Sequence, residues 1–181
     1  MTQMGHILAG TAVGVASLPG RHSRTAQALH LLVFAILGTV PDWPLPGWGH
    51  ERYYFSHSVF VALVPITGML FLFLFFPAAR KKVGGWPVLL TAGGAWLSHL
   101  LLDSFYNHGY GIAIFWPFSE ARLVLPIPWL AVVPGPAFPP TPAKLREVFL
   151  ELVTFSPLIV LACIARSGWV HFRGERTASK S

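Results

Sequence analysis

The feature that most constrains this chain is a long apolar run without charge. Residues Ser58–Pro77 (SVFVALVPITGMLFLFLFFP) are 20 in number and include no charged side chain. One crossing of a lipid bilayer requires about 20 apolar residues in a helix, which satisfies its own backbone hydrogen bonds. The run therefore predicts a transmembrane helix. The composition agrees, because 54% of the 181 residues are hydrophobic and only 11% are charged, against about 25% charged in soluble domains.

Four further apolar segments accompany this run. Trp86–Phe105 and Val148–Ile164 are long enough to span a bilayer, although the second is interrupted by one glutamate and one proline. Gly5–Leu18 and Ala26–Val40 are shorter, so they could be short spans, tilted or re-entrant helices, or helices that lean on the other three. We expect an all-α, polytopic membrane bundle of about five helices. No polar linker divides residues 1–181, which predicts a single integral-membrane domain.

The basic residues are distributed unevenly among the predicted loops. Nine of the 13 follow the first, third and fifth helices: Arg21, Arg24, Arg80, Lys81, Lys82, Arg166, Arg173, Arg176 and Lys180. The other four are Arg52, Arg122, Lys144 and Arg146. The positive-inside rule then predicts five crossings, with the N-terminus outside and the C-terminus in the cytoplasm. The net charge of +6 fits this topology better than it fits nucleic-acid binding, because no aromatic-interleaved basic groove accompanies it.

Ionisable residues in and beside the apolar segments are predicted to meet at one membrane face. His99 and Asp103 form an H-x-x-x-D pair that lies on one side of a helix. Ionisable residues inside a membrane segment are costly and often mark functional sites. In the predicted topology His6, Asp42 and His57 lie at the same outer end, although they belong to three other helices. This convergence indicates a functional site rather than a purely structural role for these residues in helix packing.

These imidazole and carboxylate side chains are predicted to lie at the same depth in the membrane, and both kinds of group are ligands of zinc. We therefore predict one or two zinc ions, or another divalent metal, held by these five residues, with His108 in the following loop as a sixth candidate. Structural interpretations also exist. The His–Asp pair could join two helices by a hydrogen bond, His6 could be a solvated residue, and Asp42 could be a turn residue. Ser56 could cap the following helix and make His57 incidental. The complete set favours a metal, because a structural core gains little from so many desolvated polar groups.

Five motifs in a fixed order also carry a family resemblance. They are GHILAG with His6, VPDW with Asp42, SHS with His57, HLLLD with His99 and Asp103, and WPFS at Trp116–Ser119. The set resembles the YdjM-like family of inner-membrane-associated metal-dependent hydrolases, over about residues 4–120. Members usually carry an acidic residue two positions after the Asp of the PD turn and an Arg four positions before the His of the HS motif. This chain has Pro44 and Tyr53 there, with Arg52 one residue further back.

The same order of His and Asp residues is similar to the metal framework of the zinc-dependent phospholipase C and P1-nuclease fold, an all-helical phosphodiesterase architecture. The similarity implies that Asp103 bridges two metals and that His6 serves one of them. The ligands implied for the other are Asp42, His57 and His99. The next motif of that framework is His-x-x-x-Glu, whereas His108 is followed by Ile112 at the Glu position, so a third metal is not expected.

The predicted metal site and the two resemblances together indicate a phosphodiesterase- or phospholipase-like hydrolase. A divalent metal lowers the pKa of a water molecule and polarises the phosphoryl or carbonyl oxygen under attack. Asp42 or Asp103 would orient the water or act as the base. Arginine or hydroxyl side chains would hold the substrate anion, the candidates being Arg52, Arg122, Ser56 and Ser58. A site about one turn inside the membrane boundary favours a membrane lipid or lipid-linked substrate at the extracytoplasmic face of the cytoplasmic membrane. The alternative is a non-enzymatic protein that binds or transports a metal or interacts with other proteins.

Overall fold

The chain folds almost entirely into helices. The computed structural model describes residues 3–18, 23–43, 55–105, 111–125 and 139–178, the last nine by their backbone alone. The elements are α1 (Gln3–Ser17), α2 (Arg24–Thr39), η1 (Val40–Asp42), η2 (Phe55–His57), α3 (Val59–Phe75), α4 (Pro77–Val83), α5 (Trp86–Ser104) and α6 (Pro142–Ala178). Among the described residues, β-type pairing is limited to one isolated bridge between Ile112 and Leu123. The predicted all-α class is confirmed.

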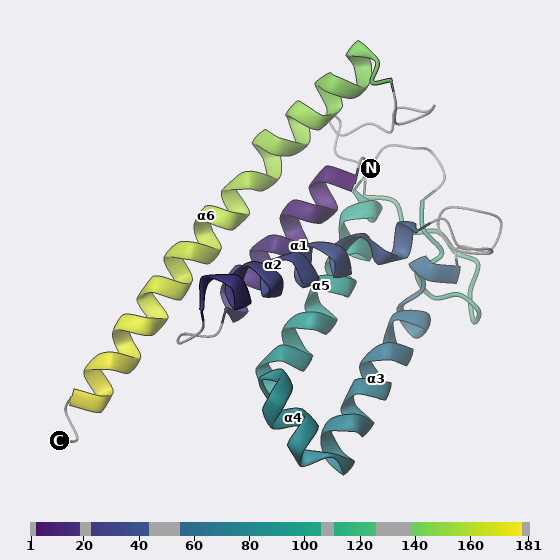
Figure 1. The fold of residues 1–181 in the computed structure, drawn as a ribbon. Helices are drawn as coiled ribbons and strands as arrows, with labels where there is room; N and C mark the ends of the chain where they lie inside the picture. The colour runs from purple at the N-terminus through teal and green to yellow at the C-terminus, as the bar shows by residue number, and fades with distance from the viewer. Residues whose placement is uncertain (1–2, 19–22, 44–54, 106–110, 126–138, 179–181) are drawn as a thin grey trace.

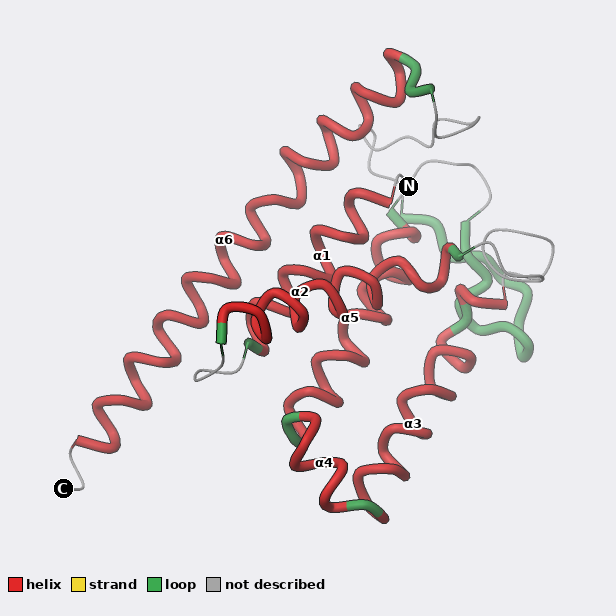
Figure 2. The backbone as a smooth tube through the Cα atoms, viewed as in Figure 1, coloured by secondary structure: helices red, strands yellow, loops and turns green. Residues whose placement is uncertain are grey.

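Helix α1 lies at the centre of the arrangement, in contact with α2, α5 and α6. Figure 1 shows α2 running across α1 and α5, the long α6 along one side, and α3 on the other side. Helix α4 joins α3 to α5, so that these two helices run in opposite directions. In Figure 2 the loop segment 111–125 gathers at the end of the bundle where α3 begins and α5 ends. That end of the bundle therefore collects residues from several distant parts of the sequence.

Glycines allow α1 and α2 to approach closely. A Cβ atom added at Gly10 would lie 2.4 Å from the carbonyl oxygen of Phe34, and one added at Gly38 would lie 2.4 Å from the carbonyl oxygen of His6. Small residues at helix contacts let backbones approach in this way in membrane proteins. The Gly38 contact places His6 directly against the end of α2.

The helices include segments that suit a bilayer. Among the described residues, Arg24–Asp42 and Pro142–Trp169 are long and apolar enough to cross a membrane, and α3 with α4 forms a third candidate across a bend of 117°. Helix α5 is not among these candidates, because His99 and Asp103 lower its hydropathy, and α1 has only 15 residues. These helices are those expected of a membrane protein, whereas the number of five crossings stays a prediction.

The structure corrects two predicted helix boundaries. The apolar run Ser58–Pro77 was predicted as one helix, but α3 ends at Phe75 and the chain turns sharply into α4. The segment Val148–Ile164 is part of a much longer helix, α6, of 37 residues. Pro157 lies within α6 without ending it, as prolines do in membrane helices.

Candidate metal centre

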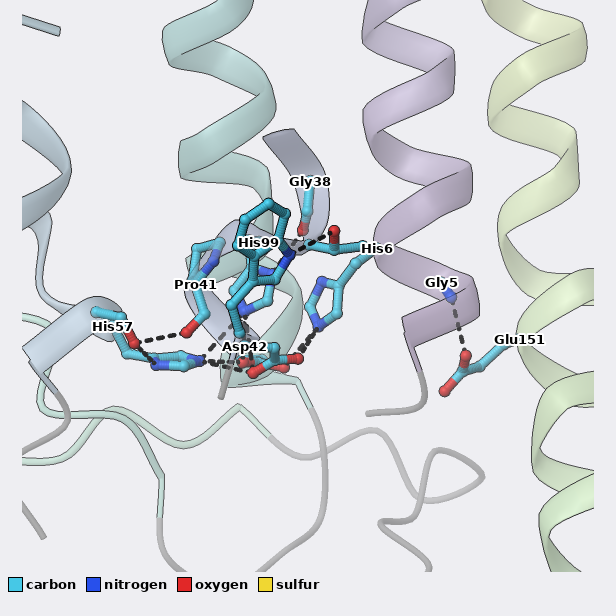
Figure 3. A network of polar contacts seen from close by, with 12 residues as sticks. Gly5, His6, Gly38, Pro41, Asp42, His57, His99 and Glu151 are labelled. Atoms are coloured by element: carbon cyan, nitrogen blue, oxygen red, sulfur yellow. Dashed lines mark hydrogen bonds and ion pairs between the residues drawn. The ribbon is translucent and has the colours of Figure 1, made fainter. Parts of the chain in front are cut away.

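Five ionisable side chains from four parts of the chain meet at one end of the bundle (Figure 3). His6 comes from the first turns of α1, Asp42 ends η1, His57 ends η2, and His99 and Asp103 lie in the last turns of α5. The three histidines are 0% exposed and Asp103 is 1% exposed, while the side chain of Asp42 is 10% exposed. The structure thus brings together five of the six predicted metal ligands in an almost completely buried site.

Local sequence explains where two of these residues are held. Pro41 lies in the first turn of η1, just after α2 ends, and the one-turn helix carries Asp42 beyond the end of α2. Ser58 caps α3 by accepting a hydrogen bond from the amide of Phe60 at 3.2 Å. The cap fixes the start of α3 and therefore the position of His57 immediately before it. Ser56, the N-cap considered from the sequence, is not the cap.

The two carboxylates face the Nε2 atoms of all three imidazoles. Asp103 Oδ2 lies 2.8 Å from His57 Nε2 and 3.2 Å from His99 Nε2, and Asp103 Oδ1 lies 3.2 Å from His6 Nε2. Asp42 is slightly further away, with its oxygens at 3.4 Å from His57 Nε2 and 3.6 Å from the Nε2 atoms of His6 and His99. Asp103 is therefore the central residue of this His/Asp cluster.

Hydrogen bonds behind the cluster orient two of the rings. His99 Nδ1 donates to the carbonyl oxygen of Gly38 at 2.7 Å. His57 Nδ1 lies 3.0 Å from the hydroxyl of Ser56, which donates its own hydrogen to the carbonyl oxygen of Pro41 at 2.6 Å. A carbonyl only accepts hydrogen bonds, so these contacts place the proton of each neutral ring on Nδ1 and leave a lone pair on Nε2. Metal-binding histidines are oriented in the same way.

The two oriented rings point their lone pairs at one another. The Nε2 atoms of His57 and His99 lie 3.2 Å apart, and carboxylate oxygens surround them. Two lone pairs at this distance repel, and the nearby negative charges add to the repulsion. The arrangement is stable when a cation is shared between these atoms, either a proton or a metal ion. Because imidazole nitrogen and carboxylate oxygen are ligands of divalent metals such as zinc, the donor set fits such an ion.

In the absence of a metal, a proton on His57 can offset part of the negative charge of the two carboxylates. Burial alone would lower the pKa of His57, but hydrogen bonds to Asp103 and Asp42 outweigh burial and raise its pKa above the ordinary value of 6.5. A proton on His57 is then held by the two carboxylates. Metal binding must displace that proton, because only the deprotonated ring has a lone pair to offer.

Geometry selects four residues as the most compact candidate ligand set. One ligand atom from each of His6, Asp42, His99 and Asp103 lies within 4.8 Å of the ligand atoms of the others. The ring of His6 stacks on that of His99, with centroids 3.6 Å apart and an angle of 15° between the planes. Both nitrogens of His6 are buried; Nδ1 has no hydrogen-bond partner among the described residues, and the contacts of Nε2 are its ion pairs with Asp103 and Asp42. A metal bound between these groups would be coordinated by His6 Nε2 together with the two carboxylates.

The remaining predicted residues are placed differently. Arg52 and His108 lie outside the described residues. Arg122 is exposed in the segment 111–125. The hydroxyls of Ser56 and Ser58 donate to the backbone carbonyls of Pro41 and Trp116, so they are engaged within the protein and not directed to a substrate. The suggestion that His6 is solvated is wrong, since its side chain is completely buried.

The groups that hold the ligands in place are not evident from the sequence. The carbonyl oxygens of Gly38 and Pro41 have no signature in the sequence, because any residue offers a carbonyl. Glu151 was noted only as an interruption of an apolar run, yet it is 0% exposed and accepts a hydrogen bond from the amide of Gly5 at 2.9 Å. A charge inside an apolar helix needs a partner, and this rule could have drawn attention to it.

Comparison with known proteins places the chain in one family. The sequence model of the YdjM inner membrane protein family matches residues 1–170. No curated protein and no solved structure matches the chain. The match includes all five members of the His/Asp cluster and most of α6. The chain belongs to the YdjM inner membrane protein family.

Proposed function

We propose that this membrane protein is a metal-dependent hydrolase that cleaves a phosphoester or related ester in a membrane lipid or lipid-linked substrate. The observation that carries the proposal is the inward convergence of three Nε2 atoms and two carboxylates in one buried cluster. A structural His–Asp pair needs one imidazole and one carboxylate. This cluster has three imidazoles and two carboxylates. The Nδ1 atoms of His57 and His99 are already hydrogen-bonded, which is how proteins orient histidines that bind a metal through Nε2.

The position of the cluster supports a lipid substrate. Helix α3 begins and α5 ends beside the cluster, so a headgroup bound there could leave its acyl chains along these helices. An apolar cavity of about 600 Å³ adjoins them, lined by Phe55, Phe60, Val61, Val64, Pro65, Trp96, Pro117 and Phe118. Its volume falls within the range of about 300–1,000 Å³ for ligand pockets. Phe55 belongs to the same one-turn helix as His57, so the cavity begins close to the cluster.

The residues of the cluster suit distinct roles in hydrolysis. A bound divalent metal would lower the pKa of a water molecule and polarise the phosphoryl or carbonyl oxygen. Asp103 contacts all three histidines and would hold them as a ligand set. Asp42 is the more exposed of the two carboxylates and would orient the attacking water or accept its proton. Arg52 remains our candidate for holding the substrate anion, because arginine matches the oxygens of a phosphate group.

The proposed location is the extracytoplasmic face of the cytoplasmic membrane. It rests on the positive-inside rule, since nine of the 13 basic residues follow the first, third and fifth predicted helices. The described part of the structure places the cluster at the opposite ends of α3 and α5 from the basic helix α4, which contains Arg80, Lys81 and Lys82. Helix α4 would then lie at the cytoplasmic surface.

A panel of lipid substrates tests the proposal. Purified protein is supplied with Zn²⁺, Mn²⁺ or Mg²⁺ and incubated with phospholipids, glycolipids and polyprenyl phosphates, with product detected by mass spectrometry. We expect metal-dependent cleavage that is abolished in Asp103→Asn, because the amide keeps the shape of the side chain but loses the charge. Glu120→Gln, at an exposed carboxylate, is the matched control and should retain activity.

The other outcomes of this experiment assign the alternatives. Bound metal without turnover on any substrate would favour a metal-binding or metal-transport protein. Protein that binds no metal, before or after reconstitution, would make the cluster a set of structural ion pairs and favour a protein-interaction role.

A further inference from the structure

Two charged side chains of α6 meet the two ends of α1. The carboxylate of Glu151 accepts a hydrogen bond from the amide of Gly5 at 2.9 Å. The guanidinium of Arg166 donates to the carbonyl oxygen of Leu18 and lies 3.5 Å from that of Val15. The first amides and last carbonyls of a helix lack partners within it and carry partial positive and negative charge. Each charged side chain of α6 thus matches the end of α1 that has the opposite sign.

The position of His6 depends on how the first turns of α1 are held more than the positions of His57 and His99 do. The Nδ1 atoms of His57 and His99 are hydrogen-bonded to Ser56 and to the Gly38 carbonyl. His6 Nδ1 has no hydrogen-bond partner among the described residues. The position of its ring is therefore set by the backbone of α1, by stacking on His99 and by the ion pairs of Nε2 with Asp103 and Asp42, with no hydrogen bond at Nδ1 to orient it from behind. Gly5, whose amide is held by Glu151, is the residue immediately before His6.

We propose that Glu151 is a positioning residue of the metal centre. By accepting the amide hydrogen of Gly5, it holds the first turns of α1 against α6 and thereby keeps His6 Nε2 facing Asp103 and Asp42. This inference rests on the proposed metal centre and does not require that the protein is an enzyme. Arg166 fixes the opposite end of α1 and stabilises the same pair of helices away from the cluster.

Metal titration of the full-length protein distinguishes positioning from general stabilisation. Co²⁺ is added to purified wild type, Glu151→Leu, Glu151→Gln and Arg166→Leu, and its visible absorption reports both affinity and ligand geometry. We expect Glu151→Leu to weaken Co²⁺ binding about tenfold or more, the scale of losses at groups that orient ligands, and to change the spectrum. Glu151→Gln should restore most of the affinity, because its amide oxygen can accept from Gly5. Arg166→Leu should lower thermal stability and leave the spectrum unchanged.

A double-mutant cycle with His6→Ala tests whether Glu151 acts through His6. Once His6 is absent, Glu151→Leu should change the Co²⁺ affinity less than about twofold, since coupled residues are not additive. Independent effects that multiply would overturn the inference, and so would a wild-type spectrum and affinity in Glu151→Leu. If Glu151→Leu does not fold, Glu151→Asp replaces it in both experiments, with a smaller loss of affinity expected because the acceptor is drawn back by one methylene.

Hydrogen exchange separates failure of this inference from failure of the proposed function. If wild-type protein binds neither Co²⁺ nor Zn²⁺, the proposed metal centre is refuted and the positioning of α1 is judged on the metal-free protein. Exchange of the amides of Gly5 and His6 should then be at least about tenfold faster in Glu151→Leu than in wild type, and unchanged in Arg166→Leu. Equal exchange in wild type and Glu151→Leu would show that Glu151 does not hold this end of α1.

Discussion

Substitution of Gly38 by alanine should damage the cluster through a single backbone contact. The added Cβ atom would lie 2.4 Å from the carbonyl oxygen of His6 and 3.3 Å from Gly10 Cα, whereas ordinary contacts begin near 3.4 Å. Helices α1 and α2 must therefore separate by about 1 Å. That shift would move His6 and also the Gly38 carbonyl that accepts from His99. Metal–ligand distances tolerate only about 0.2 Å, so we expect the metal affinity of Gly38→Ala to fall at least about tenfold.

The effect on folding should be smaller than the effect on metal binding. Overpacking costs about 1–3 kcal/mol, and the better helix propensity of alanine offsets about 1 kcal/mol of it. The free energy of unfolding should thus decrease by no more than about 2 kcal/mol. Gly68→Ala and Gly94→Ala are matched controls within helices, because a Cβ atom at either position meets nothing within 4 Å.

Metal titration by calorimetry, together with thermal unfolding of the metal-free proteins, checks this prediction. The two control variants should bind metal as wild type does and be equally or more stable. Wild-type metal affinity in Gly38→Ala would refute the reasoning that the contact between α1 and α2 sets the geometry of the cluster.

Three further predictions follow from the same site. His99→Ala should reduce bound metal at least about tenfold, measured as metal content per protein after dialysis, whereas retention of metal would remove His99 from the ligand set. The raised pKa of His57 should stabilise the metal-free protein below pH 6.5, and this contribution should be lost as pH rises through the raised pKa; a melting temperature with the same pH dependence in His57→Gln would contradict it. In a Cys163→Ser background, a membrane-impermeant thiol reagent should label a cysteine at Gly47 but not one at Lys81 in intact cells, and the reverse pattern would place the site in the cytoplasm.

The convergence of the cluster was predictable from the positions of the ionisable residues in and beside the apolar segments. His99 and Asp103 stand inside an apolar segment, and the alternation of basic loops puts His6, Asp42 and His57 at the same end of their helices. Lipid solvates none of these groups well, so they must meet one another or a ligand. Hydropathy and helix order were therefore enough to predict the convergence, and the structure brings all five residues together.

The parts that escaped prediction depend on tertiary contacts. Helix α6 continues past Ile164 although the hydropathy signal ends there, because a helix can extend beyond the apolar segment that marks it. The partner of Glu151 is the end of α1, 146 residues away in sequence, and no local pattern reveals such a pairing. The close approach at Gly38 is a property of two packed helices, as is the role of its carbonyl group.

The metal content of the purified protein tests the central claim most directly. Wild-type protein is isolated without chelators, reconstituted with Zn²⁺, dialysed and measured by inductively coupled plasma mass spectrometry beside Asp103→Asn and Glu120→Gln. We predict one or two equivalents of divalent metal in wild type and Glu120→Gln, and at least about tenfold less bound metal in Asp103→Asn, because Asp103 contacts all three histidines. Equal metal content in Asp103→Asn and wild type, or none in any of the three proteins, would contradict a metal centre at this cluster.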